Sequence, residues 1–422
     1  MKTGLGIRFQ APFRILVMLL FALSVIFLLA SCPATQVVFY NYLPIDVGTV
    51  AAPNIPVVSV TVCVPGTTDC RTVPNIEVDT ASIGLRIFSQ ALSITLPPEQ
   101  SGTNPIAECL VFGSGSAWGP VSLASVTLGG EPSINVPIQI IDSTFGTASP
   151  PVPCDSDLLV SPGSLGNVNG ILGVEEGQFD QSFEYFVCQS GSCTAVAPPS
   201  VQQVQNPVFL LPQDNNGIFV FMSGVPNQGA AQGTGALILG IGTGPGNDPQ
   251  FVSSGNPYSI LSTSSRAFNT TYKGNVIFPG FIDTGTNFLI FPDSSIPTCT
   301  IGISSEPFYC PQPSPMGLIG ANSANTGPSE NVGFLVANPS TLLNSGRSGA
   351  FNDLAIPFGF DGGGFDWGLP FFFGRSVFIA YSHTVLGDTP LWGWAGNSQS
   401  SAERRLKVLQ KQMRQTHPQS SP

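Results

Sequence analysis

The chain has 422 residues, of which 42% are apolar and only 9% carry a charge, and its formal net charge is −11. This apolar content argues against an intrinsically disordered chain, because it can bury enough apolar surface to offset the entropy of ordering. Nucleic-acid binding needs a basic footprint, and the body of this acidic chain has none. Abundant glycine (47) and proline (39) favour short strands joined by turns.

Residues 1–31 are predicted to be a lipoprotein signal peptide that takes no part in the fold. Three cations precede an apolar stretch, 15–29, which is short for a membrane span of about 20 residues. The sequence Leu29-Ala-Ser-Cys32 then resembles a bacterial lipobox, whose cleavage leaves a lipid-bearing cysteine. We therefore expect Cys32 to anchor the protein in the bacterial cell envelope, and Pro33 favours the outer membrane. An ordinary signal peptide with an incidental cysteine and an uncleaved anchor are the alternatives.

Residues 32–55 are expected to form an extended lead-in, and residues 56–242 the first of two β-lobes. The alternating segment from Pro56 to Cys63 predicts a strand, and a turn leads into a second strand that reaches Asp79-Thr-Ala-Ser. An acid beside an apolar strand is unusual, because burying an unpaired carboxylate is costly. Asp79 is therefore a candidate functional residue.

Two further features of the first lobe follow this turn. Two predicted strands flank the glycine-rich tip Phe112-Gly113-Ser114-Gly115, and a hairpin tip of this kind can be mobile. A compact apolar element then ends near Gly173. Turn-rich sequence from Thr243 marks the expected start of the second lobe, residues 243–395.

The second lobe repeats the design of the first. In Pro279-Gly-Phe-Ile-Asp283-Thr-Gly-Thr286 an apolar run leads into an acid-bearing turn, where glycine allows close approach of the backbone. A later apolar element reaches Gly368, and its separation from Asp283 is similar to that of Gly173 from Asp79. Two copies of one acid-bearing turn suggest two related lobes that place two carboxylates in one site.

The tail, residues 396–422, is basic and has a slight helical periodicity. A solvated helix or a frayed end is the plain interpretation, and docking on anionic lipid or an envelope polymer is the functional one.

Nine cysteines are present, and the eight besides Cys32 suggest disulfides, because an even number is typical of exported proteins. Short spacings suggest three local pairs and one long link, although sequence alone leaves the connectivity open. The suggested pairs are Cys63–Cys70, Cys188–Cys193, Cys299–Cys310 and Cys109–Cys154. With no CxxC pair and only two histidines, a metal site is not expected.

With these pieces in order, the chain resembles a pepsin-like aspartic peptidase from about residue 50 to about residue 385. In that family each of two lobes donates one aspartate from an Asp-Thr-Gly-Ser/Thr turn, followed by an apolar element ending in glycine. The resemblance implies an all-β, bilobal double β-barrel with an interlobe cleft. It also implies that the tip at 112–115 is the flap that covers the substrate. The chain further resembles a group of bacterial lipoproteins that share a domain of unknown function, and that resemblance carries no activity.

The resemblance implies peptide-bond hydrolysis without a metal or an organic cofactor. Asp79 and Asp283 would form a dyad that shares one proton, because two carboxylates held close together cannot both ionise. The dyad would activate a water molecule for attack on the peptide carbonyl. Two threonines would brace the turns against each other and two further hydroxyls would bind the outer carboxylate oxygens. These supporting residues would be Thr80 and Thr284, and Ser82 and Thr286.

Three residues depart from the family pattern. Ala81 replaces a glycine, so that its methyl group would crowd the carboxylates and any positive φ would be strained. Phe112 replaces the usual flap tyrosine, and Arg86 replaces the tryptophan that supports it. The Arg86 cation could pair with a carboxylate of the lobe or lower the pKa of a nearby acid.

These departures leave three functions open. The first is a lipid-anchored envelope aspartic endopeptidase. The second is a catalytically silent protein that binds a peptide or protein ligand in the interlobe cleft, and the third is a structural envelope protein with buried turn acids. We expect a monomer that is attached to the membrane through the Cys32 lipid and has no nucleic-acid partner.

Overall fold

The computed structural model describes residues 41–396 apart from several short gaps. The signal segment, residues 32–40 of the lead-in with Cys32, the tail beyond residue 396, and Ser114 of the predicted flap lie outside the described residues. The gaps are 114, 148, 155–158, 181–183, 245–246, 248–258, 263–266, 302–306, 325–328, 344–348, 358–362, 382–383, 385 and 387.

Most of the regular structure is β-strand, as predicted, and the largest sheet has 16 strands. Its strands are β1 (Tyr42–Val47), β2 (Pro56–Cys63), β3 (Cys70–Asp79), β4 (Ile83–Phe88), β5 (Gln100–Ser101), β6 (Asn104–Phe112), β7 (Gly115–Leu128), β8 (Glu131–Ile141), β9 (Gly170–Val174), β10 (Glu184–Gln189), β11 (Ser192–Val196), β12 (Gly217–Met222), β13 (Gly233–Leu239), β14 (Ser259–Ser262), β24 (Arg375–Ala380) and β25 (Leu391–Gly396).

A second sheet has seven strands, and two short strands pair separately. The seven are β15 (Phe268–Tyr272), β16 (Asn275–Ile282), β17 (Leu289–Ile290), β20 (Met316–Ser323), β21 (Ser329–Val336), β22 (Ala355–Ile356) and β23 (Phe365–Trp367), and the separate pair is β18 (Thr298–Cys299) and β19 (Phe308–Tyr309). The described helices are short: η1 (Ser89–Ala91), η3 (Ser200–Gln202), η4 (Pro207–Leu210), α3 (Pro339–Leu343) and α4 (Leu369–Phe372).

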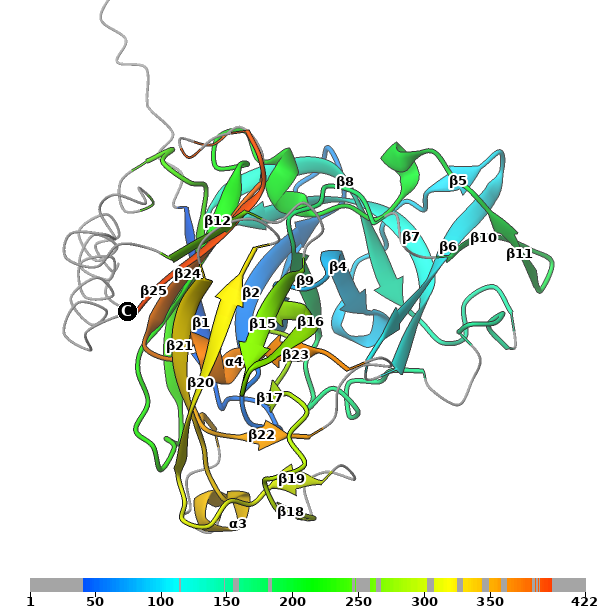
Figure 1. Cartoon of the computed structure of the whole chain (residues 1–422). Coiled ribbons are helices and arrows are strands. Elements are labelled where there is room, and N and C mark those ends of the chain that lie inside the picture. Colours follow the sequence, from blue (N-terminus) through cyan, green and yellow to red (C-terminus); the bar gives the residue numbers. More distant parts are fainter. Residues whose placement is uncertain are drawn as a thin grey trace, which may run out of the picture. The chain divides into compact units, whose positions relative to one another are not determined.

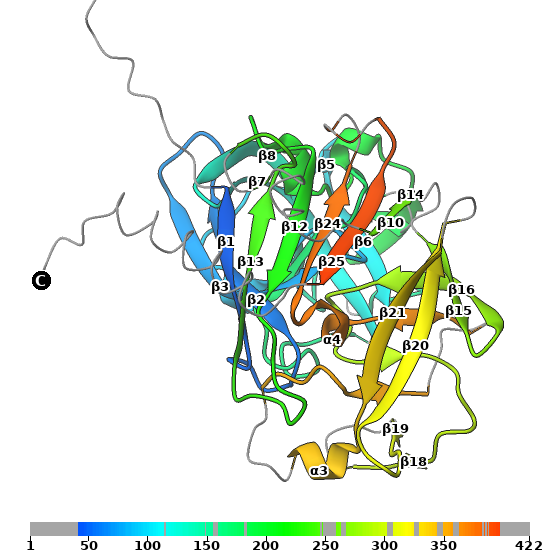
Figure 2. The same ribbon diagram turned by 60° about the vertical axis from the view of Figure 1, so that its left-hand side comes forward.

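Part of the large sheet closes into a barrel. Its strands run in the order β7-β8-β4-β9-β3-β2, and β2 pairs with β7 again, so that this part leaves no open edge. Beyond β2 the sheet continues through β1, β13, β12, β24 and β25, which Figure 2 shows side by side. Strands from the two ends of the chain therefore share one sheet (Figure 1).

The strands that carry the two acid-bearing turns have the same pairing pattern in both sheets. β9 lies parallel to β3 and antiparallel to β4, while β23 lies parallel to β16 and antiparallel to β17. β4 and β17 each then pair in parallel with one more strand, β8 and β22. The repeat seen in the sequence is therefore a repeat of topology, with Asp79 and Asp283 at equivalent places.

One hydrophobic core supports both turns. It includes Val78 and Leu172 behind the first turn, and Ile282, Leu289 and Trp367 behind the second, all of them buried. The strands that cross behind the turns, β9 and β23, are buried along their whole length and support the backbone of each turn.

The described residues belong to one compact unit. The lobe boundary at residue 243 falls within this unit and stays a prediction.

The four suggested disulfides are all formed: Cys63–Cys70, Cys109–Cys154, Cys188–Cys193 and Cys299–Cys310. No helix in the described part of the chain has both the length and the apolar character needed to cross a membrane.

Candidate active site

Two threonines join the acid-bearing turns. The backbone N–H of Thr80 donates to Thr284 Oγ1 (3.1 Å), and the N–H of Thr284 donates to Thr80 Oγ1 (3.0 Å). Each hydroxyl in turn donates to a carbonyl of the opposite strand, Ile282 O for Thr80 (2.9 Å) and Val78 O for Thr284 (2.6 Å). Because both threonines are fully buried, these four hydrogen bonds fix the separation of the turns.

The Asp79 carboxyl is held by its own turn. Its Oδ1 accepts from the N–H of Ala81 (2.8 Å), and its Oδ2 accepts from the hydroxyl of Ser82 (2.5 Å). The residue is only 8% exposed. Asp79 is therefore fixed in orientation, while a small part of its surface stays open to solvent.

The Asp283 carboxyl has the same pair of contacts. Its Oδ1 accepts from the N–H of Gly285 (2.7 Å) and its Oδ2 from the hydroxyl of Thr286 (2.8 Å). A further hydrogen bond joins the side chains of Asp283 and Asp79. The structure thus brings the two aspartates together as one dyad, with matching donors on each side.

The electrostatics of the dyad keep a proton on Asp283. Burial and then the negative charge of Asp79 raise the pKa of Asp283 to about 8, against the lowering effect of the bonds from Thr286 and Gly285. The hydrogen bond to Asp79 also favours the protonated form. At acid and neutral pH, therefore, the protonated Asp283 carboxyl can donate a hydrogen bond to an acceptor atom between the two carboxyls.

Two more acids, which were not among the candidate residues predicted from the sequence, lie behind the dyad. Glu77 stands two residues before Asp79 on β3 and is 7% exposed, and Asp366 on β23 is fully buried opposite Phe281. Burial, and then the charges of the dyad, raise the pKa of both acids well above the usual range. The sequence does carry a signal for Glu77: in Ile-Glu-Val-Asp79 it stands two residues before Asp79 in an apolar strand, so that both side chains lie on the same face.

The expected strain at Ala81 is absent. Ala81 has no left-handed backbone, and its side chain is exposed. The equivalent Gly285 is needed for space, because a Cβ there would lie 2.8 Å from Asp79 Oδ1 and 3.2 Å from Asp283 Oδ1. The two turns are thus alike in hydrogen bonding but differ in how closely this third residue approaches the carboxyls.

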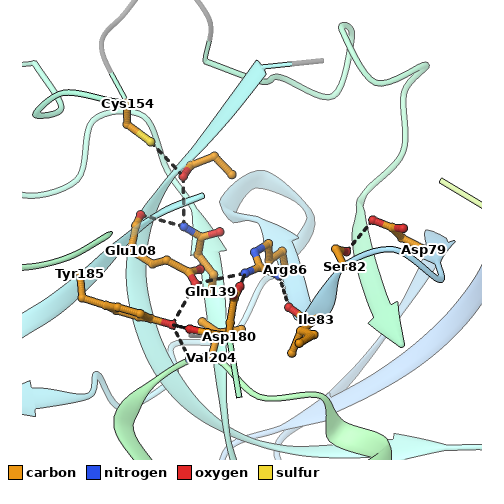
Figure 3. Close-up of polar contacts among 11 residues, drawn as sticks. Asp79, Ser82, Ile83, Arg86, Glu108, Gln139, Cys154, Asp180, Tyr185 and Val204 are labelled. Atoms are coloured by element: carbon orange, nitrogen blue, oxygen red, sulfur yellow. Dashed lines mark hydrogen bonds and ion pairs between the residues drawn. The ribbon is translucent and has the colours of Figure 1, made fainter. Parts of the chain in front are cut away.

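Arg86 has a structural role in the first barrel. Its side chain is fully buried and forms ion pairs with Asp180 and Glu108 (Nη2 to Oε1 3.1 Å), and Nη1 donates to Ile83 O (Figure 3). The hydroxyl of Tyr185 also donates to Glu108 Oε1 (3.0 Å). Of the two roles considered for Arg86, the structure shows the ion pair with carboxylates of the lobe.

The predicted flap is a hairpin of β6 and β7, with Phe112 paired to Gly115 across its tip. Phe112 is half-buried and packs on a cluster that contains Phe88 and Leu110, whereas Gly113 is exposed. Ser114 lies outside the described residues. The covering role of this hairpin stays a prediction.

A cavity of about 390 Å³ lies beside the second sheet, and its walls include Phe334, Phe371 and Arg375 but neither aspartate of the dyad.

In the described part of the chain, no group of three or more His, Cys, Asp or Glu side chains is arranged to hold a metal ion.

Comparison with known proteins agrees with this geometry. The chain resembles an aspartic proteinase from Irpex lacteus with a TM-score of 0.51 and 17% identity, over 86% of this chain and 98% of that protein. A likeness at this identity establishes the fold, which is the predicted all-β, bilobal fold of the pepsin-like aspartic proteinases. A comparison with curated proteins finds no match. Residues 38–394 match the model of the family described as "Protein of unknown function (DUF3443)", and the chain belongs to that family.

Proposed function

We propose that this chain is an aspartic endopeptidase. The observation that carries the proposal is the dyad: two matching turns, joined by the hydrogen bonds of Thr80 and Thr284, bring Asp79 and Asp283 together. Burial raises the pKa of Asp283 to about 8, which supports a shared proton. The ionised partner of the dyad takes a proton from a bound water, whose oxygen attacks the peptide carbonyl carbon. The Asp283 proton is donated to the developing oxyanion, and the leaving nitrogen then takes up a proton from the dyad as the C–N bond breaks.

Peptide cleavage by the full-length, detergent-solubilised protein tests this proposal. A broad peptide library is incubated with the wild type and with Asp283→Asn between pH 3 and pH 8, and products are identified by mass spectrometry. We expect cleavage by the wild type alone. If the wild type and Asp283→Asn give the same cleavage products, or if neither gives any, the proposal is wrong.

Binding of pepstatin gives a test that needs no substrate. Its hydroxyl mimics the attacked carbonyl, so that tight binding requires a formed dyad. We expect a rise in melting temperature with pepstatin that is absent in Asp79→Asn and in Asp283→Asn. A rise without cleavage of any peptide would support a binding function in place of hydrolysis.

The second candidate is a catalytically silent protein that binds a peptide in the cleft between the lobes. Ala81, which stands where the second turn has Gly285, and the missing hydroxyl at Phe112 favour it. Ala81→Gly separates the candidates: a gain of peptidase activity in this variant would mean that the natural turn is impaired.

We also propose that the protein is anchored by a lipid on Cys32 in the bacterial envelope, in the outer membrane. The support is the sequence Leu29-Ala-Ser-Cys32 and the following Pro33. Mass spectrometry of the protein isolated from membranes should find a diacylglyceryl group on Cys32, and Cys32→Ser should leave the signal segment uncleaved. An unmodified Cys32 would contradict the anchor.

A further inference from the structure

Asn54, in the loop between β1 and β2, has an unusual environment for an asparagine. Its backbone is left-handed, with φ at 57°, and the residue is only 1% exposed. Asparagine is one of the few residues other than glycine that adopt this conformation readily. The loop thus turns a polar side chain inward at a place where an unpaired amide would be costly.

The side-chain amide and the backbone N–H of Asn54 are hydrogen-bonded to the second half of the chain. Its Nδ2 donates to Asn287 O (2.8 Å) and to Phe351 O (2.9 Å), and its Oδ1 accepts from the N–H of Phe351 (2.8 Å). Its backbone N–H donates to Gly349 O (2.9 Å). A buried amide that uses both donors and its acceptor fixes its partners in a single geometry.

The contact with Asn287 is reciprocal. The Asn287 Nδ2 donates to Pro53 O (2.5 Å), while Asn287 O accepts from Asn54. Asn287 directly follows Thr286, whose hydroxyl binds Asp283 Oδ2 (2.8 Å). The loop at 53–54 therefore holds the chain four residues beyond the Asp283 carboxyl.

The third segment of this arrangement supports the strand that leaves the Asp283 turn. Beyond Phe351, the carbonyl of Leu354 accepts from the N–H of Leu289 (3.0 Å), and β22 then pairs with β17. By binding both Asn287 and Phe351, Asn54 ties the turn and its supporting strand to the first half of the chain.

We propose that Asn54 and Asn287 are positioning residues, which form a second reciprocal brace between the two halves of the chain and fix the Asp283 carboxyl relative to Asp79. The brace of Thr80 and Thr284 acts on the residue after each aspartate, and the brace of Asn54 and Asn287 acts on the far end of the Asp283 turn. Its effect on catalysis rests on the proposed function, since a dyad misplaced by about 1 Å can cost on the order of 10²-fold in rate.

The test compares Asn54→Gly with Asn135→Gly. Glycine keeps the left-handed backbone available and removes only the amide. Asn135 has the same backbone conformation, with φ at 53°, but is exposed on β8. For each full-length protein, the Asp283 carboxyl is titrated by carbon-13 NMR, with its signal assigned by its absence in Asp283→Asn, and kcat and KM are measured on a cleaved peptide.

We expect Asn54→Gly to lower the pKa of Asp283 by about one unit or more, because the carboxyls separate. We expect kcat to fall on the order of 10²-fold with KM changed less than about twofold, and Asn135→Gly to change neither quantity. Should Asn54→Gly not fold, Asn287→Ala carries the test with the same expected shifts.

The outcomes separate this inference from the proposed function. A shifted Asp283 titration in a protein whose wild type cleaves no peptide would support the brace and contradict the peptidase. An Asp283 titration and a kcat equal to those of the wild type, in a variant that is merely less stable, would overturn the brace.

Discussion

Gly285 and Ala81 occupy the same place in the two acid-bearing turns, yet only Gly285 is constrained by space. A Cβ at Gly285 would lie 2.8 Å from both Cγ and Oδ1 of Asp79, whereas the Ala81 side chain is exposed. Real Cβ atoms do not approach this closely, so the carboxyls must move apart in Gly285→Ala.

We expect Gly285→Ala to abolish pepstatin binding and to lower kcat/KM on the order of 10²-fold or more. Thermal shift and steady-state kinetics measure these effects. Ala81→Ser is the matched control, because it changes the equivalent exposed position and should keep pepstatin binding. Unchanged binding in Gly285→Ala would show that the turn relaxes without separating the carboxyls.

The acids behind the dyad make a prediction about stability and pH. The raised pKa of Asp366 means that the folded state binds its proton more tightly than the unfolded state, which releases it near pH 4. The bound proton on Asp366 therefore stabilises the fold fully below about pH 4, and this stabilisation is lost as the pH rises towards the raised pKa of the folded state. The same holds for the proton on Glu77. Asp366→Asn and Glu77→Gln should therefore lose less stability than the wild type between pH 4.5 and pH 8.

Chemical denaturation at these two pH values measures the difference. Asp293→Asn is the control with an unchanged slope: although burial raises its pKa, hydrogen bonds from Lys273, Ser295 and Tyr272 hold the pKa of Asp293 at about 2, so that this carboxylate does not titrate between pH 4.5 and pH 8. That carboxylate stabilises the fold above about pH 4 and ceases to do so as the pH falls towards 2. A wild-type pH dependence in Asp366→Asn would show that this acid is not protonated in the fold.

At the scale of elements, the sequence predicted the acid-bearing turns because apolar runs, acids and glycines are local patterns. The apolar elements at Gly173 and Gly368 were also predicted, as elements ending in glycine, and the structure shows that they are the strands β9 and β23. The strands β24 and β25 join the sheet of the first barrel through long-range pairing. Such pairing produces no pattern in the local sequence, so it could not be predicted. The brace at Asn54 was missed for the same reason, because its partners lie at positions 287 and 349–351.

The ion pairs of Arg86 link β4 to β6 and to the segment at Asp180. Arg86→Met would leave two buried carboxyls, Glu108 and Asp180, without their cation, and breaking a buried pair costs about 3–5 kcal/mol. Burial raises the pKa of Glu108 to about 8 despite Arg86, so that the loss should be larger at pH 9 than at pH 6.

Urea denaturation at both pH values measures this loss in the free energy of unfolding. Arg71→Met is the matched control, because Arg71 pairs with Asp69 at the surface and such pairs contribute about 0–1 kcal/mol. Similar losses in the two variants would mean that the buried network contributes no more than a surface pair.

For the whole molecule, buried acids determine how stability depends on pH. Burial is the main cause that raises the pKa values of Glu108 and Asp283 to about 8 and that of Asp353 to about 7, whereas the pKa of Asp293 is lowered to about 2. Each unit of pKa difference corresponds to about 1.4 kcal/mol, so that the raised acids outweigh Asp293. The repulsion within a chain of net charge −11 acts in the same direction as the pH rises.

We therefore expect the protein to be most stable on the acid side, and to lose several kcal/mol of unfolding free energy between about pH 4.5 and pH 8. This is the opposite of ordinary acid denaturation, in which paired carboxylates lose their partners as the pH falls. Chemical denaturation across this range measures the slope, and Asp353→Asn should reduce it without changing pepstatin binding, because no hydrogen bond or charge effect of the dyad acts on Asp353. A stability that rises towards neutral pH would mean that these acids are ionised in the folded protein, and a dyad with two charges could not share a proton.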